Sequence, residues 1–154
     1  MKEPKQLSVI AIQNGTVIDH IPAKNLFKVI QILRLDKIDN QITFGTNLDS
    51  KKLKRKAIIK ISGVFFEDED INRIALVAPD AKLNIIRDYE VIEKKVVKAP
   101  ENITGIVKCM NPKCITNYEQ VVTKFKVVSK KNMELKCHYC EKITNQENLN
   151  YITL

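Results

Sequence analysis

The chain has 154 residues, which allows one domain or two small ones. Hydrophobic residues make up 44% of it and charged residues 29%, a composition that is typical of folded proteins and excludes disorder as the main state. No apolar stretch approaches the ~18 residues that a membrane-spanning helix needs, and the N-terminus lacks an apolar signal segment, so we expect a cytoplasmic protein without membrane contact. The net charge of +8 favours polyanionic partners.

Strand and helix patterns alternate along the first hundred residues. Short apolar stretches at 7–12 and 17–21 predict extended chain. Pro22 suits the first turn of a helix, and apolar side chains then recur at helical spacing as far as Leu35. Residues 41–48 predict the next strand. Because the stretch at 7–12 is too apolar for an exposed sheet edge, we expect this part of the chain to form dimers through an edge or an open face of its sheet.

A second strand–helix unit follows. Residues 57–65 predict a strand, and the basic run 51–56 before it reads either as a solvated connection or as an anion-binding surface. Acidic side chains at 67–70 are suited to the positive end of a second helix, which Pro79 helps to stop. Its buried face is predicted to consist of Ile71, Ile74, Ala75 and Ala78.

Residues 83–86 and 89–92 predict two final strands in this region. The order strand–helix–strand–strand–helix–strand, with one strand added, is typical of the ferredoxin-like (βαββαβ) fold, an α+β arrangement. Such a sheet carries both helices on one face and leaves the other face open for a ligand or partner.

A domain boundary is predicted between Val96 and Asn102, where residues 98–101 are polar and include a proline. The 54 residues at 101–154 contain all four cysteines. A piece shorter than ~70–80 residues rarely folds on its core alone, so we expect a metal or covalent link to stabilise a small all-β domain here.

The cysteines form two pairs. Four residues separate Cys109 from Cys114, two separate Cys137 from Cys140, and each pair sits in a turn. Two such turns facing each other supply four thiolates, the ligand set of a structural, tetrahedral Zn²⁺ site. Disulfides and an iron–sulfur centre are the alternatives, and the lack of a signal segment argues against disulfides. With four sulfurs available, His138 is expected to be an exposed turn residue. Nearby basic side chains would offset the charge of the site, namely Lys108, Lys113, Lys136 and Lys142.

A phosphate site would have to use side-chain cations, because the chain has only four glycines and no Gly-rich phosphate loop. His20, Lys60 and Lys94 are candidates near strand ends, and Asp19 could accept hydrogen bonds from a ribose. On pattern alone, the plainer interpretation is that Asp19 caps the helix that follows and His20 lies at the surface.

Two stretches resemble one known family closely. Residues 15–21 read Gly-Thr-Val-Ile-Asp-His-Ile, and residues 137–142 read Cys-His-Tyr-Cys-Glu-Lys. With Asn84, Tyr89 and the first cysteine pair between them, these motifs resemble the regulatory chains of aspartate carbamoyltransferase over essentially the whole sequence. Ile10 stands where well-known members have an acidic residue.

The resemblance implies a non-catalytic regulatory subunit in pyrimidine biosynthesis, with no enzyme activity of its own. Residues 1–100 would form a nucleotide-binding allosteric domain, with CTP typically inhibiting and ATP typically activating. Residues 101–154 would form the zinc domain that contacts the catalytic chain. Regulatory dimers would join catalytic trimers into a dodecamer.

The resemblance also carries over a nucleotide site. Asp19 and Lys60 would hold the ribose and base, whereas His20, Lys56 and Lys94 would face the phosphates. The base would lie between Ile12, Ile86, Tyr89 and Val91. The positions that match the family site are Val9, Ala11, Ile12, Val17, Asp19, His20, Lys56, Lys60, Asn84, Ile86, Tyr89, Val91 and Lys94, and the metal ligands are Cys109, Cys114, Cys137 and Cys140.

The alternative function is a nucleic-acid-binding zinc protein, because ferredoxin-like sheets, zinc sites and positive charge also occur together in that class. Those sheets stack bases on aromatic side chains, and residues 57–62 contain none. The sequence therefore argues against nucleic acid as a partner. A catalytic metal site is disfavoured more strongly, since four thiolates leave no open coordination position.

Overall fold

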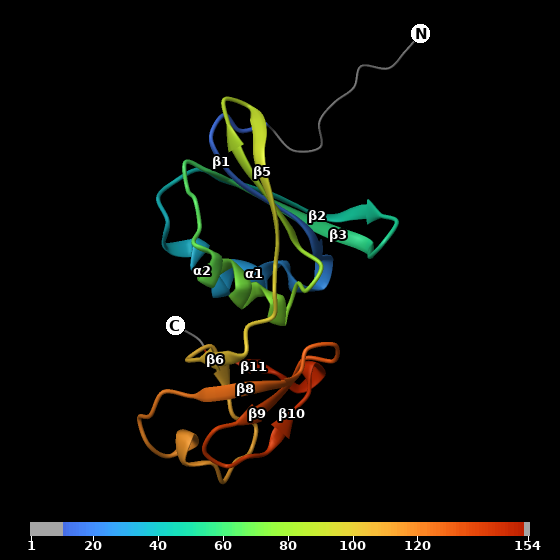
Figure 1. The fold of residues 1–154 in the computed structure, drawn as a ribbon. Helices are drawn as coiled ribbons and strands as arrows, with labels where there is room; N and C mark the ends of the chain where they lie inside the picture. The colour runs from blue at the N-terminus through green and yellow to red at the C-terminus, as the bar shows by residue number, and fades with distance from the viewer. Residues whose placement is uncertain (1–10, 153–154) are drawn as a thin grey trace. The chain divides into compact units, whose positions relative to one another are not determined.

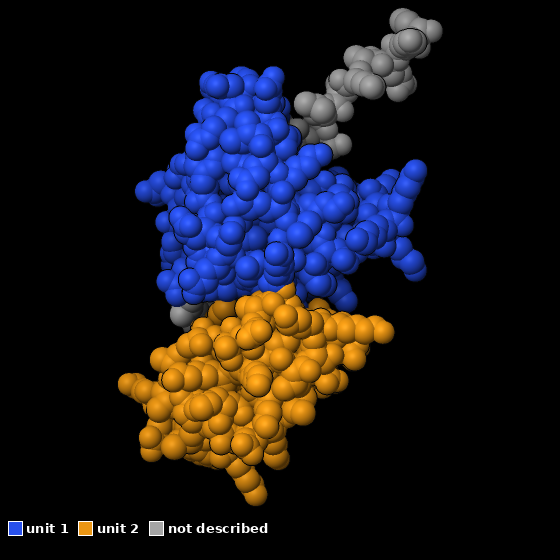
Figure 2. Space-filling view, viewed as in Figure 1, with its two compact units in different colours: residues 1–98 blue, residues 99–154 orange. Residues whose placement is uncertain are grey.

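A computed structural model of the chain describes residues 11–152. The chain divides into two compact units at Lys98 and Ala99, coloured separately in Figure 2. No helix among the described residues is long and apolar enough to cross a membrane.

The first unit is an antiparallel five-stranded sheet with the strand order β2-β3-β1-β4-β5. This order confirms the ferredoxin-like arrangement with one strand added at the edge. In chain order its elements are β1 (Gly15–Pro22), α1 (Leu26–Ile32), β2 (Ile42–Ser50), β3 (Lys54–Ser62), α2 (Asp68–Asn72), β4 (Lys82–Arg87) and β5 (Glu90–Val96), with short 3₁₀ turns at Ala23–Asn25, Leu35–Lys37 and Arg73–Leu76.

The core of this unit lies between the sheet and its two helices, which cover the same face of the sheet (Figure 1). Cross-strand register places Ile18 of β1 between Ile59 of β3 and Leu83 of β4, and all three side chains are fully buried. Ile71 and Ile74 from the second helical segment are buried as predicted. Because side chains alternate along a strand, the neighbours of these core residues lie on the open face.

Several predicted boundaries differ from the structure. The first described strand begins at Gly15, Ala11 and Ile12 are not in a strand, and residues 7–10 lie outside the described part of the chain. Pro22 ends β1, so α1 begins four residues later than predicted. Phe27 follows the helical spacing but is 69% exposed.

The basic run is only partly a connection. Residues 54–56 already belong to β3, because this hairpin pairs out to Lys54 and Ser50 and is longer than the apolar pattern indicated. The turn itself is therefore reduced to residues 51–53.

The second unit consists of small sheets, with no α-helix among its described residues. Ile103, Phe125, Val127, Leu135 and Cys137 are buried on one face of its main sheet. That sheet has the order β10-β9-β8-β6, built from β6 (Asn102–Thr104), β8 (Lys124–Ser129), β9 (Glu134–Cys137) and β10 (Ile143–Thr144), while β7 (Val107–Lys108) pairs with β11 (Asn150–Tyr151).

Candidate metal centre and nucleotide-binding face

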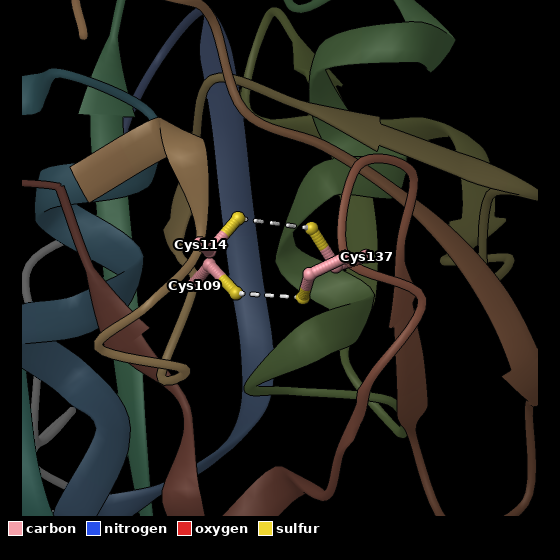
Figure 3. A group of neighbouring side chains, drawn as sticks. Cys109, Cys114 and Cys137 are labelled. Carbon is pink, nitrogen blue, oxygen red and sulfur yellow. Dashed lines mark hydrogen bonds between the residues drawn. The ribbon is translucent and has the colours of Figure 1, made fainter. Parts of the chain in front are cut away.

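The four cysteine sulfurs of the second unit meet at one point. Sγ of Cys109 lies 3.7 Å from Sγ of Cys140, and Sγ of Cys114 lies 3.8 Å from Sγ of Cys137. All four sulfurs lie within 4.8 Å of one another. Figure 3 shows Cys109 and Cys114 on one side of the cluster and Cys137 on the facing loop.

These distances fit a single tetrahedral metal ion. Four sulfurs around a zinc ion, each at about 2.3 Å from it, lie about 3.8 Å apart. A disulfide needs an S–S distance of about 2.05 Å, so the observed pairs are not disulfides, and all four cysteines are free. The sulfurs of a [4Fe–4S] cluster would sit outside a cube of atoms and therefore much farther apart than these.

Hydrogen bonds within each turn hold the sulfurs in place. In the first turn, the Cys114 N–H donates to the Asn111 carbonyl at 3.0 Å, and the Asn117 side chain donates to the carbonyls of Cys109 and Asn111. In the second turn, the Glu141 N–H donates to the Cys137 carbonyl at 3.0 Å. The Thr116 hydroxyl lies 3.2 Å from Cys114 Sγ, a contact that orients the ligand from outside the metal sphere.

Burial and hydrogen bonds shift the pKa values of the thiols in this cluster in opposite directions. Burial raises the pKa of Cys109 to about 12. Burial also raises the pKa of Cys140, but hydrogen bonds from Asn111 and from the Lys142 N–H outweigh it and lower that pKa to about 7. Four thiols this close, three of them buried, cannot all ionise without a positive charge between them. A divalent ion held by the four cysteines would supply that charge and would favour the loss of the remaining thiol protons.

His138 and Lys136 are neighbours of Cys137 in the sequence, but neither side chain belongs to the sulfur cluster. His138 is exposed and packs edge-on against Tyr139, as predicted for a turn residue, and it is not part of the four-cysteine cluster. Lys136 lies on the outer face of β9, opposite to the buried Cys137, since adjacent strand residues alternate between faces. Its charge is thus directed away from the cysteine side of the sheet.

In the first unit, the candidate nucleotide residues gather on the open face of the sheet. Val17 of β1 is paired with Lys60 of β3 on one side and with Asn84 of β4 on the other, and Asn84 is paired with Lys94 of β5. These residues therefore form one row across four strands, although as many as 77 positions separate Val17 from Lys94 in the sequence. Partial burial lowers the pKa of Lys60.

An ion pair lies beside this row. Lys56 Nζ is 2.9 Å from Oδ1 of Asp19 and 3.2 Å from Oδ2. Burial raises the pKa of Asp19, but the hydrogen bonds and charges of Lys56 and His20 outweigh it, so the net pKa is lowered. The turn after β1 has no side-chain cap, so the interpretation of Asp19 as a helix cap is wrong.

The backbone of His20, near the end of β1, is strained. Its φ is 61°, a left-handed conformation that non-glycine residues rarely adopt, and the β1–β3 register shifts between Ile18 and Ile21. Its Nδ1 atom is buried, lies 3.6 Å from Asp19 Oδ1 and has no hydrogen-bond partner among the described residues. Backbone strain of this kind concentrates at functional sites.

A bulge brings the predicted base-binding residues to the same face. The β4–β5 register shifts between Ile85 and Ile86, so that Ile86 pairs with Val91 while Asn84 pairs with Lys94. Val91 and Lys94 thereby share a face despite their odd spacing. Tyr89 follows at the turn, where its N–H donates to the Gln13 carbonyl at 3.0 Å.

Lys82 was not singled out by the sequence analysis. It is exposed and lies directly opposite Asp19 in the β1–β4 register, two residues before Asn84 on the same face of β4. The period-2 spacing from Asn84 could have identified it. Of the remaining candidates, Ala11 and Ile12 precede β1, and Val9 lies outside the described residues, as does Ile10.

Comparison with known proteins identifies both units. Residues 7–98 match the family model of the aspartate carbamoyltransferase regulatory chain, allosteric domain, and residues 101–150 match its metal binding domain. The chain is 58% identical to the aspartate carbamoyltransferase regulatory chain of Bacteroides fragilis, covering 99% of this chain and 100% of the relative. It is 53% identical to the regulatory chain of Pyrococcus horikoshii, covering 94% and 96% respectively.

Proposed function

Because the chain belongs to the aspartate carbamoyltransferase regulatory chain family, we propose that its first unit binds nucleoside triphosphates, CTP and ATP, and transmits their effect to catalytic chains. The chain is a regulatory subunit, and the family description implies that it is non-catalytic. The observation that carries the proposal is the row of Lys60, Val17, Asn84 and Lys94 on the open face of the sheet.

The chemistry of this face suits a triphosphate. Lys60, Lys94, Lys82 and Lys56 supply four ammonium groups, whereas Asp19 is the carboxylate that the ion pair places among them. Charge-assisted hydrogen bonds from such groups to phosphate oxygens are stronger than neutral ones. Val91 is exposed and adds an apolar surface on which a base can rest, and its register partner Ile86 is buried beside it. This arrangement supports a ligand that has a charged phosphate tail at one end and a flat aromatic base at the other.

We further propose zinc as the metal of the second unit. The sulfur separations of 3.7 and 3.8 Å support zinc, and so does the closed set of four thiolates, which zinc accepts without geometric strain. Its role is structural, because the coordination sphere has no open position. Reduced thiols are typical of the cytoplasm, and we include that location in the proposal.

The regulatory role is tested by assembly with the catalytic chain. When the two chains are coexpressed, we expect them to copurify and the catalytic rate at fixed aspartate to change when CTP or ATP is added. The same assay on the catalytic chain alone should show no nucleotide response. A complex that forms but ignores both nucleotides would remove the allosteric part of the proposal while leaving the assembly part intact.

We propose in addition that the first unit forms the regulatory dimer through the β2 edge. Among the described strands β2 pairs only with β3, so its outer edge is free. Next to this edge, Phe27 is 69% exposed and Phe44 46% exposed, and their rings meet edge-to-face with centroids 6.2 Å apart. A free strand edge beside an apolar patch favours pairing with a second copy.

Phe44→Glu should therefore convert the dimer to a monomer, because it places a charge in the apolar contact. Sedimentation velocity at micromolar concentration measures the change. The matched control is Val96→Glu, which alters a 60% exposed apolar residue on the opposite edge strand β5. If Phe44→Glu remains dimeric while Val96→Glu dissociates, the dimer forms through the β5 edge instead.

A further inference from the structure

The outer face of the main sheet in the second unit carries a group of lysines that the proposed function does not use. Lys124 and Lys126 of β8 and Lys136 of β9 point to this face, since the residues between and beside them are buried on the other one. We call these three residues the lysine face. The three belong to one unit and lie on the side of the sheet opposite to the buried Cys137.

The register of the sheet places like charges directly beside one another. Lys126 is paired with Lys136 on β9 and with Asn102 on β6, while Lys124 is paired with Thr104. Like charges opposite each other on neighbouring strands destabilise a sheet. Neighbouring strands are about 4.8 Å apart and alternate residues about 7 Å apart along a strand, so three ammonium groups share a small area.

No carboxylate among the described residues forms an ion pair with these three amines. Within residues 11–152, the three lysines form neither an ion pair nor a side-chain hydrogen bond. Glu141 is the one acidic residue that lines the same hollow, and Glu134 lies two residues from Lys136 on β9 without pairing with a lysine. The face therefore keeps an excess of positive charge that an external anion can neutralise.

The lysine face is hollowed to the size of a small ligand. A groove of about 400 Å³ is lined by all three lysines together with Asn102, Thr104 and His138. Grooves of roughly 300–1,000 Å³ are typical of small-molecule sites. The amide, the hydroxyl and the imidazole add hydrogen-bonding groups to the three ammonium groups. The exposed side chains of β6, β8 and β9 include no aromatic ring, so the face offers no stacking platform for nucleic-acid bases.

We propose that the lysine face binds a small anion with two or more phosphoryl groups, separately from the nucleotide site of the first unit. Such an anion places several oxygens within reach of Lys124, Lys126 and Lys136 at once, and relieves the repulsion between Lys126 and Lys136. The proposal does not rest on the nucleotide function, because the two faces belong to different units.

The test uses the full chain with its metal bound and pyrophosphate as the probe. To remove the first-unit site, all variants carry Lys60→Ala and Lys94→Ala. In this background, calorimetry should still detect pyrophosphate binding, and two-dimensional NMR should locate it at Lys126 and its neighbours. Adding Lys126→Ala should weaken the binding about tenfold, the effect of losing one charge-assisted hydrogen bond.

Matched control variants distinguish binding at the lysine face from nonspecific attraction to the positive charge of the whole unit. Lys131→Ala removes the same charge from the exposed β8–β9 turn of the same unit, outside the groove, and should leave pyrophosphate affinity unchanged. Lys126→Gln, which removes the charge but keeps a polar side chain, should behave like Lys126→Ala, and an unchanged metal content shows that each variant is folded. Equal weakening by Lys126→Ala and Lys131→Ala would overturn the proposal, as would the absence of pyrophosphate binding.

Two further ligands identify the source of the phosphoryl groups. If the lysine face binds CTP as tightly as it binds pyrophosphate, the triphosphate of a nucleotide can occupy it. If it binds CTP more weakly, its ligand is a free polyphosphate. Both outcomes support the proposal. An acidic peptide is the contrasting ligand. If it binds more tightly than pyrophosphate and this binding is lost in Lys126→Ala, the lysine face is a contact for another protein and the proposal is contradicted.

Discussion

Cys137→Ser is expected to unfold residues 99–154 while the sheet of the first unit stays folded. The second unit is too small to be stable on its apolar core alone. Structural zinc contributes about 10–16 kcal/mol of binding free energy in comparable thiolate peptides, which is as much as the whole stability of a typical domain. A serine hydroxyl does not ionise near neutral pH, so three thiolates remain and the closed sphere is lost.

The measurement is native-state hydrogen exchange read by unit, together with the metal content of the purified chain. Protection should disappear at Phe125 and Leu135 and remain at Ile18 and Ile59, because each pair lies in the core of a different unit. Binding to the catalytic chain should be lost, whereas CTP binding should persist. Chelators or mercurials acting on the unaltered chain should reproduce the same pattern.

His138→Ala is the matched control, since it changes the residue next to Cys137 without touching a ligand. It should retain the metal and the fold. A Cys137→Ser chain that stays protected at Leu135 and still binds the catalytic chain would reduce the four cysteines to ordinary core residues. Metal analysis of the unaltered chain decides between zinc and a single iron ion, which four thiolates can also hold.

The metal cluster could be predicted from sequence because its ligands are local. Each pair of cysteines lies within one turn, so the spacing of Cys109 and Cys114 and of Cys137 and Cys140 already requires each pair to converge. The order of strands and helices was predictable for the same reason, since periodicity is a local property of the chain. The sequence does not show that the two turns face each other. In the structure they do, with Sγ–Sγ distances of 3.7 and 3.8 Å between the two pairs.

Which side chains meet on the open face of the first unit depends on the register between its strands. The hydrophobic periodicity of each strand does not determine that register. Two register shifts, at Ile18–Ile21 and at Ile85–Ile86, decide which side chains share a face. Without the second shift, Val91 and Lys94 would lie on opposite faces. Period-2 spacing from Asn84 is enough to place Lys82 on this face, but its position opposite Asp19 follows only from the register.

Replacing both Lys60 and Lys94 by alanine should weaken CTP binding by two orders of magnitude or more. Each lysine is positioned to donate charge-assisted hydrogen bonds, which contribute about 1.5–3 kcal/mol each. Every 1.4 kcal/mol is a factor of ten in affinity. Isothermal calorimetry on the full chain measures the change. The control is Lys24→Ala with Lys51→Ala, which removes two exposed charges of the same unit that lie outside the row.

The separation of the two lysines makes their contributions distinguishable. Lys60 on β3 and Lys94 on β5 are three strand spacings apart, which is about 14 Å between their backbones. Sites at that distance usually contribute additively. One nucleotide lying along the row would therefore meet Lys60 at its ribose and base and Lys94 at its phosphates.

That orientation predicts different losses for CTP and for cytidine, which lacks the phosphates. Lys94→Ala should weaken CTP binding about tenfold and leave cytidine binding unchanged, because the lost partner is a phosphate. Lys60→Ala should weaken both ligands by similar factors, because the shared part of the two molecules lies beside it. Equal losses of cytidine affinity in the two variants would place the nucleotide across the row rather than along it. Unchanged CTP affinity in both would move the nucleotide site to another face of the protein.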